Sequence, residues 1–197
     1  VIDCTIKSSK ELGTEPTVLT LANHPVEVLW DVKPEFITTI DERLELFQKA
    51  GVENVILLEF TEQLAHFSAD EYLKNIILNL NPKSIIMGYN HHFGSQKTGD
   101  ENFLRTAGEK FGFKVFVIPP VKLDEAAISS TLIRNLIKTG KVEEAAKFLG
   151  RPYKVRNKVI KGEQRGRQMG FPTANMTIPA RKIVPEFGVY TGDVTYN

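Results

Sequence analysis

Cysteine is almost absent from this chain of 197 residues, because Cys4 is the only one. A single thiol cannot form an internal disulfide, which excludes a small scaffold held together by disulfide bonds. The low count is typical of a reducing compartment, so we expect a cytoplasmic protein. A lone thiol of this kind is usually a small core side chain rather than a nucleophile.

Long apolar runs and an excess of one charge are also lacking. No stretch approaches the length of a membrane span, and no charged-then-apolar leader is present, so we expect neither a membrane helix nor a signal peptide. The net charge is +1, with 42% hydrophobic and 25% charged residues. These proportions are typical of a soluble globular protein, and the length is sufficient to bury a sizeable core.

The charges are unevenly distributed along the chain. Residues 151–197 hold nine Lys or Arg against three Asp or Glu, and residues 1–150 therefore carry a surplus of five negative charges. This break near Gly150 predicts a domain boundary, with a basic second domain that suits an anionic partner. Charge alone allows nucleic acid, but the basic residues are not interleaved with aromatic ones. Small phosphorylated ligands fit the basic charge as well, and we expect them, rather than nucleic acid, as the partners.

Four short apolar runs predict strands that are buried on both faces of a sheet. They occupy residues 18–21, 55–58, 85–87 and 115–118. Helical patterns lie between them, at residues 40–50, 68–80 and 100–111, and another opens the chain at residues 1–12. Alternating strands and helices favour a parallel α/β sheet with helices on both faces. The first helix has no capping residue, so we expect its start to be missing.

The pattern of apolar and polar residues changes in the last third of the chain. Two helical stretches, at residues 130–139 and 142–149, precede two stretches in which apolar and polar residues alternate, at residues 153–161 and 189–196. Alternation predicts antiparallel strands. The 47 residues after Gly150 are too few to close a barrel of normal size. We therefore expect an incomplete β domain, or one whose edges are covered by something else.

A short polar loop follows the first predicted strand. Ligands of open α/β sheets bind beyond the carboxyl ends of the strands, which is where Asn23, His24 and Pro25 fall. His24 and Pro25 are therefore candidates for contact with a nucleotide base or phosphate. The alternative is a structural histidine that the following proline holds in place, and the sequence favours neither.

The loop at residues 88–94 follows the third predicted strand. Gly88 and Gly94 bracket it, and glycine lets the backbone approach a ligand closely. His91 and His92 suggest a metal, but no cysteine or carboxylate completes a ligand set at zinc spacing. A loop that contacts substrate is the better interpretation, with Asn90 as the donor.

A third loop leads into the helix predicted at residues 130–139. Ser130 and Thr131 stand at its start, where free backbone N–H groups and the helix dipole favour an anion. Arg134 follows Ser130 by four residues and so lies on the same face. Together these residues predict a phosphate cradle. The alternative is a simple serine cap beside a surface arginine.

A glycine-rich basic loop occupies residues 161–175. It is suited to wrap a polyphosphate, although it lacks the closing Gly-Lys-Ser/Thr of a Walker loop. Thr173 and Asn175 are two residues apart, and both offer oxygen ligands for Mg²⁺ that is held partly by substrate phosphates. A glycine-rich β-turn is the alternative. The candidate binding residues in this loop are Gly162, Gly166, Arg167, Gly170, Phe171, Thr173 and Asn175.

Two of these segments resemble known signatures. Residues 128–134 resemble the Ile-Ser-Ser-Thr-x-Ile-Arg motif of nucleotidylyltransferases with a Rossmann-like fold. Residues 162–175 resemble the Gly-Phe-Pro-Thr-Ala-Asn motif of riboflavin kinases. Both motifs in this order, with Leu-Gly-Arg-Pro-Tyr at residues 149–153 between them, resemble the prokaryotic bifunctional riboflavin kinase/FAD synthetase family over essentially the whole chain.

The resemblance implies an α/β Rossmann-like nucleotidylyltransferase domain over residues 1–150 and a small, incomplete antiparallel β-barrel of riboflavin kinase type over residues 151–197. It implies ATP and Mg²⁺ as requirements. Riboflavin would be phosphorylated to FMN, and FMN adenylylated to FAD with release of pyrophosphate. Ser130, Thr131, Arg134 and Asn90 would serve the adenylylation. Thr173 and Asn175 would hold Mg²⁺ for the kinase.

The chain departs from the family pattern at both ends. The family's Gly-x-Phe-Asp-Gly-x-His-x-x-His-type segment does not occur, and we expect it before Val1. The glutamate that serves the kinase as catalytic base is expected beyond Asn197. Two alternatives stay open: a nucleotidylyltransferase with a single activity, and a non-catalytic protein that binds nucleotide or flavin.

Overall fold

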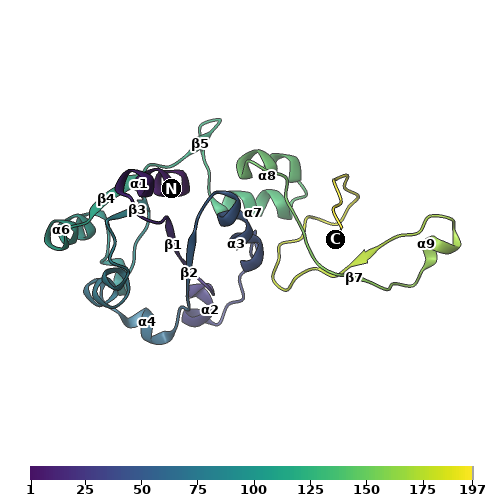
Figure 1. The fold of residues 1–197 in the computed structure, drawn as a ribbon. Coiled ribbons are helices and arrows are strands. Elements are labelled where there is room, and N and C mark those ends of the chain that lie inside the picture. The colour runs from purple at the N-terminus through teal and green to yellow at the C-terminus, as the bar shows by residue number, and fades with distance from the viewer. Residues whose placement is uncertain (197) are drawn as a thin grey trace. The chain divides into compact units, whose positions relative to one another are not determined.

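The computed structural model describes residues 1–196, which form two compact units (Figure 1). The first unit comprises Val1–Pro34 and Ile40–Val121, and the second comprises Glu35–Thr39 together with the chain from Lys122 onward. The boundary between the compact units, at Val121 and Lys122, thus differs from the charge break near Gly150. The bounds of the two functional domains stay a prediction, because a compact unit and a catalytic module are different properties.

The first unit contains two pairs of parallel strands. The pairs are β1 (Thr17–Leu21) with β2 (Asn54–Leu58), and β3 (Ser84–Gly88) with β4 (Lys114–Ile118). These strands confirm the predicted parallel α/β architecture. The predicted burial on both faces is wrong, because Leu57 is 42% exposed and Phe116 is 39% exposed. Each of these sheets has two strands among the described residues, so each strand keeps one open edge.

Helices alternate with these strands, as the sequence predicts. They are α1 (Ile2–Leu12), α2 (Pro25–Trp30), α3 (Ile40–Lys49), α4 (Glu62–His66), α5 (Ala69–Tyr72) and α6 (Glu101–Phe111). α5 continues through a π-helical turn and a 3₁₀ turn as far as Leu80, which confirms the helix predicted at residues 68–80. Its capping box is formed, since Glu71 N–H donates to Ser68 Oγ at 3.2 Å and Ser68 N–H donates to Glu71 Oε2 at 2.8 Å.

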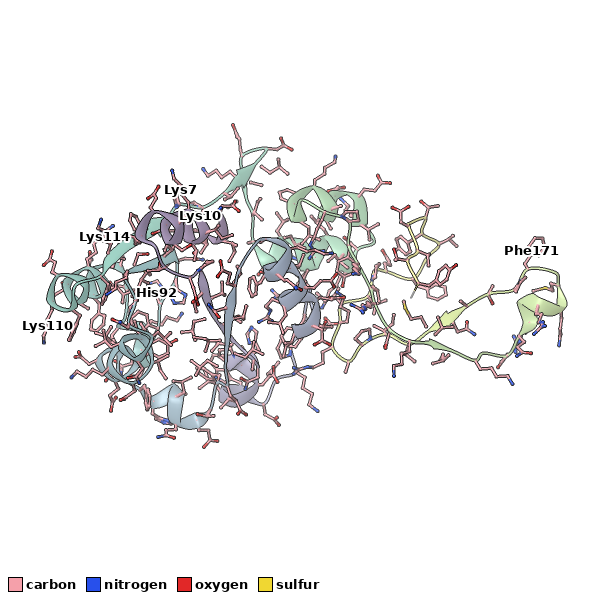
Figure 2. The ribbon with its side chains drawn as sticks, viewed as in Figure 1. Lys7, Lys10, His92, Lys110, Lys114 and Phe171 are labelled. Carbon is pink, nitrogen blue, oxygen red and sulfur yellow. The ribbon has the colours of Figure 1, made fainter. Side chains whose placement is uncertain are left out.

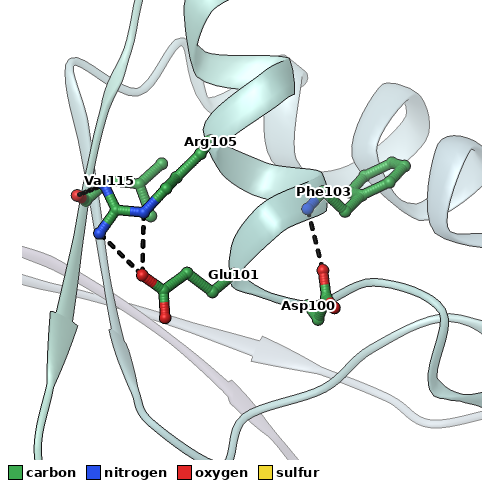
Figure 3. A network of polar contacts seen from close by, with 5 residues as sticks. All are labelled: Asp100, Glu101, Phe103, Arg105 and Val115. Carbon is green, nitrogen blue, oxygen red and sulfur yellow. Dashed lines mark hydrogen bonds and ion pairs between the residues drawn. The ribbon is translucent and has the colours of Figure 1, made fainter.

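Polar contacts fix the position of α6 against the sheet (Figure 3). Asp100 caps the helix by accepting from Phe103 N–H at 2.9 Å. Arg105 pairs with Glu101 one turn earlier and reaches the Val115 carbonyl of β4 at 3.4 Å. Beneath this surface lies the main core of the unit: Ala69, Leu73, Met87, Phe93, Leu104, Ala107 and Phe113.

The second unit contains two helices, α7 and α8, that lie in sequence between two short antiparallel strand pairs. Its elements are β5 (Lys122–Leu123), β6 (Ala126–Ala127), α7 (Ser130–Lys138), α8 (Val142–Leu149), β7 (Val159–Ile160), α9 (Arg165–Gln168) and β8 (Asn175–Met176). A core of Ile133, Leu136, Ile137, Ala145 and Ile183 joins α7 and α8 to the later chain. Among residues 1–196, no helix is both long enough and apolar enough to cross a membrane.

The predicted β domain is only partly formed. β7 and β8 pair antiparallel, which confirms that pairing mode for the segment. The strand predicted at residues 189–196 is wrong, because the described residues there contain no strand and Val189 and Val194 are 99% and 89% exposed. A strand needs a hydrogen-bonded neighbour, and alternation of side chains does not provide one. No barrel closes within the described part of the chain.

Glu35–Thr39 joins the second unit although it lies between α2 and α3 in sequence. Phe36 N–H donates to the Arg181 carbonyl at 2.7 Å, and Ile183 N–H donates to the Phe36 carbonyl at 3.0 Å. The Lys182 ammonium donates to the Ile37 carbonyl at 2.7 Å. Nothing in the sequence pattern predicted these contacts, which connect positions about 145 residues apart.

Candidate functional site

The start of α7 presents unpaired donors and hydroxyl groups. Ser129, not Ser130, is the cap, since its Oγ accepts from Leu132 N–H at 3.2 Å. This leaves the exposed hydroxyls of Ser130 and Thr131 outside the capping interaction. The backbone N–H groups of these two residues take part in none of the hydrogen bonds of residues 1–196. No acidic residue stands in the first turn, so the helix dipole favours an anion here.

Arg134 lies one turn along the same helix. Its Nε donates to the Glu35 carbonyl at 3.3 Å, which fixes one edge of the guanidinium group. No hydrogen bond or ion pair of the described residues involves its two terminal nitrogens. The structure thus brings Ser130, Thr131 and Arg134 together at the start of one helix, as the phosphate cradle requires. Their roles in catalysis stay a prediction.

His24 caps α2. Its Nδ1 accepts from Val26 N–H at 3.2 Å, while His24 N–H donates to the Glu27 carboxylate at 2.9 Å. Pro25 is the first residue of the helix, a position where its missing N–H costs nothing. The structural role that the sequence left open is therefore present, and contact with a nucleotide stays a prediction.

The loop after β3 is anchored by an aromatic residue. Phe93 is buried and packs against Tyr72 and Phe103, with ring centroids 5.0 Å and 5.8 Å apart. Asn90 is exposed, and its carbonyl lies 3.1 Å from Nδ1 of His92, which Figure 2 labels. Desolvation against the loop and, secondly, the charge of His92 lower the pKa of His91. His91 is therefore favoured in its neutral form.

Packing accounts for the second glycine of this loop. Gly94 has a φ of 73°, and a Cβ there would lie 2.7 Å from the Ala69 nitrogen at the start of α5. A larger residue at this position would displace the start of α5, whether or not a ligand binds. Gly88 is different, because a Cβ would meet only the Asn90 side chain, at 3.7 Å. The need for glycine at position 94 is thus explained by packing, without any contact with a ligand.

Two glycines of the loop between β7 and β8 make room for two later side chains. A Cβ on Gly162 would overlap the Asn175 side-chain amide. A Cβ on Gly166 would overlap the Phe171 carbonyl and lie 3.2 Å from Thr173 Oγ1. We call Gly162 and Gly166 the glycine cradle. Contact with the later side chains explains why glycine is needed at these two positions. The sequence alone had suggested only that these glycines wrap a phosphate.

The remaining loop residues surround the short helix α9. Arg165 pairs with Glu163, and Arg167 is exposed. Gly170 ends the turn with a φ of 82°, a conformation that favours glycine. Phe171 is 78% exposed and lies beside α9 in Figure 2. An exposed ring next to basic side chains is available to a ligand.

Thr173 and Asn175 fit a magnesium ion as donors. Both side chains are exposed, and neither takes part in a hydrogen bond with another described residue. Their oxygens are the hard, uncharged ligands that Mg²⁺ accepts when phosphates and waters complete its shell. Two neutral donors are too few to hold the ion alone. These residues therefore suit an ion that is delivered with a nucleotide.

Some residues near the candidate site were not singled out from the sequence, and they differ in whether a local sequence signal identifies them. A serine cap was the alternative interpretation of the start of α7, and Ser129 fills that role, as the preference for a hydroxyl residue just before a helix allows. Glu35 and Lys182 carry no local signal, because their roles depend on contacts between distant parts of the chain.

Comparison with known proteins identifies two families along the chain. The FAD synthetase family matches residues 1–132, and the riboflavin kinase family matches residues 149–197. Bifunctional riboflavin kinase/FMN adenylyltransferases are 31% identical in Listeria monocytogenes over 94% of this chain, and 36% identical in Buchnera aphidicola over 91% of it. The protein of the same name from Bacillus subtilis is 32% identical over 96% of this chain. The chain spans 60% of the length of each.

A solved structure has the same fold. It is a crystal structure described as a macrolide-efflux protein from Streptococcus pneumoniae, with a TM-score of 0.87 and 34% identity. The match covers 96% of this chain and 62% of the other. The resemblance drawn from the two motifs is confirmed by these comparisons. The chain belongs to the prokaryotic bifunctional riboflavin kinase/FAD synthetase family.

Proposed function

We propose that the full-length protein containing this chain phosphorylates riboflavin to FMN with ATP, and then adenylylates FMN to FAD with release of pyrophosphate. One observation supports the proposal: each family segment has its own set of exposed polar groups suited to phosphate or Mg²⁺. The first is the start of α7, and the second is Thr173 and Asn175 against the glycine cradle. The names of the relatives agree with both activities.

In the adenylylation, the attacking group is the phosphate of FMN, which is already anionic. No strong base is needed, so catalysis consists of aligning two polyanions and stabilising charge on the departing pyrophosphate. The exposed hydroxyls and free N–H groups of Ser130 and Thr131 suit this task, and Arg134 adds a positive charge. We propose that Asn90, Gly88, His24 and Pro25 contribute substrate contacts.

In the kinase reaction, the chain must hold the phosphates of ATP against the riboflavin hydroxyl. Thr173 and Asn175 would hold Mg²⁺, which neutralises charge on the phosphates during transfer. The loop of Gly162, Gly166 and Gly170 would cover the phosphates. The exposed Arg167 adds positive charge, and Phe171 offers a ring surface to a ligand.

We also propose the finer folds that these activities entail. The parallel strand pairs support a Rossmann-like domain, and the β7–β8 hairpin supports a β-barrel of riboflavin kinase type. The single cysteine suits a reducing cytoplasm, where ATP and flavins are available. Small molecules, rather than nucleic acid, are the proposed partners.

Chromatography of a reaction with the full-length protein, riboflavin, ATP and Mg²⁺ tests the proposal. We expect FMN to appear first and FAD to follow. Absence of both products would refute the proposal. Conversion of added FMN to FAD, without any FMN from riboflavin, would favour a nucleotidylyltransferase with a single activity.

The glycine cradle gives a specific prediction for the kinase. Gly166→Ala places a methyl group on the Phe171 carbonyl, so the backbone that carries Thr173 must shift. We expect riboflavin phosphorylation to fall about tenfold, because small displacements of a donor weaken transition-state contacts. FMN adenylylation should stay within about twofold of the parent rate.

Gly192→Ala is the matched control for this substitution. A Cβ at Gly192 meets no atom within 4 Å, so a methyl group there is tolerated. Product chromatography measures both activities for both variants. Equal kinase rates in the two variants would contradict the role given to Gly166.

A further inference from the structure

Arg134 is held by a residue from a distant part of the chain. Its Nε donates to the Glu35 carbonyl at 3.3 Å, and the Glu35 carboxylate pairs with Lys138 one turn further along α7. Glu35 thus contacts α7 through both its main chain and its side chain. A guanidinium group is planar, so a bond at Nε fixes its plane and leaves the terminal nitrogens to meet a phosphate.

The segment that carries Glu35 is fixed in turn by the chain at residues 181–183. Two backbone hydrogen bonds flank Phe36, and the Lys182 ammonium donates to the Ile37 carbonyl at 2.7 Å. Lys182 is 4% exposed, and its Nζ lies 4.8 Å from the centre of the Tyr153 ring. Loss of this donor would deprive the partly buried Ile37 carbonyl of a hydrogen-bond partner, which is costly.

We propose that Lys182 and Glu35 are positioning residues for Arg134 in the adenylylation of FMN. Lys182 holds the segment at Ile37, the segment presents the Glu35 carbonyl, and that carbonyl orients the guanidinium group. This inference rests on the proposed function, because it assumes that Arg134 acts on the pyrophosphate. It places an adenylylation determinant, Lys182, within the stretch that matches the riboflavin kinase family.

Lys182→Met in the full-length protein tests the first step. Methionine keeps an unbranched apolar stem but removes the donor to the Ile37 carbonyl. We expect kcat for FMN adenylylation to fall about tenfold, with the KM values for FMN and ATP within about twofold, because the lost contact acts in the transition state. Lys158→Met is the matched control, since Lys158 is an exposed lysine of the same segment. It should retain the parent kcat.

Glu35→Gln tests the same path with a substitution that the fold tolerates, since the Glu35 side chain is 45% exposed. It removes the ion pair with Lys138, which anchors Glu35 to α7, so the carbonyl that Arg134 contacts is held less firmly in place. We expect a fall of about threefold in kcat, again without a matching change in KM. This variant decides the proposal if Lys182→Met does not fold. An unchanged kcat in Glu35→Gln would then overturn it.

A double-mutant cycle separates positioning from simple loss of stability. If Lys182 acts through Arg134, Lys182→Met should cause no further fall in kcat when Arg134 is already alanine. The residual rate is measured at raised enzyme concentration. The proposal would be overturned if the fall in kcat of the double variant equalled the product of the falls in the two single variants. If the parent protein makes no FAD from FMN, the proposed function fails instead, so the two failures are distinguishable.

Discussion

Asn175→Ala should abolish riboflavin phosphorylation while leaving FMN adenylylation close to the parent rate. The Asn175 side chain lies against Gly162, at a place where any Cβ would overlap it, and it is exposed there without a partner among the described residues. Alanine removes the oxygen that would ligate Mg²⁺. We expect a fall of about a thousandfold, the loss typical of a strong contact to the charge that develops in the transition state.

The measurement follows FMN formed from riboflavin and, separately, FAD formed from added FMN. Asn157→Ala is a suitable control, because Asn157 is an exposed asparagine of the same segment whose amide donates to Thr177 Oγ1 at 2.7 Å. It should change neither activity by more than about twofold. A parallel fall of both activities in Asn175→Ala would show that Asn175 supports the fold and not the kinase reaction.

Arg134→Ala should produce the opposite pattern. FMN adenylylation is expected to fall about a hundredfold, since the fixed cation that we propose for the departing pyrophosphate is lost. Riboflavin phosphorylation should persist, because Thr173 and Asn175 are unchanged. Arg134→Lys keeps the charge but loses the planar fork and the Nε donor, so its rate should lie between those of the parent and the alanine variant.

Steady-state rates with saturating FMN and ATP measure this effect. Arg105→Ala provides the control, since Arg105 is a helical arginine that pairs with Glu101 one turn earlier and is 51% exposed. It should leave the adenylylation rate unchanged. FAD formation at the parent rate by Arg134→Ala would show that Arg134 has no role in adenylylation. It would therefore also contradict the positioning role proposed for Lys182.

Local sequence signals predicted most elements of the first unit. The capping box of Ser68 and Glu71 begins the helix where expected, and Gly112 ends α6 with a φ of 80°. These signals succeed because a helix start or stop depends on a few adjacent residues. The apolar runs likewise identified all four parallel strands, although their predicted burial was wrong.

The failures share a dependence on distant partners. Alternation at residues 189–196 predicted a strand, yet pairing needs a neighbour that local pattern cannot provide. The same limit applies to the candidate site. The start of α7 could be predicted from hydroxyl residues, whereas the Glu35 carbonyl that orients Arg134 comes from 99 residues away. The steric reason for Gly162 also lies in a later residue, Asn175.

The shared core of the second unit limits how such a protein could arise by exchange of gene segments. Ile133, Ile137 and Ala145 precede the break in charge near Gly150, whereas Ile183 follows it, and all four are buried together. A crossover at that break would combine α7 and α8 of one parent with the residue that replaces Ile183 in the other parent. A hybrid should therefore keep its parents' packing only when residues 35–39 and 130–183 are inherited from one parent.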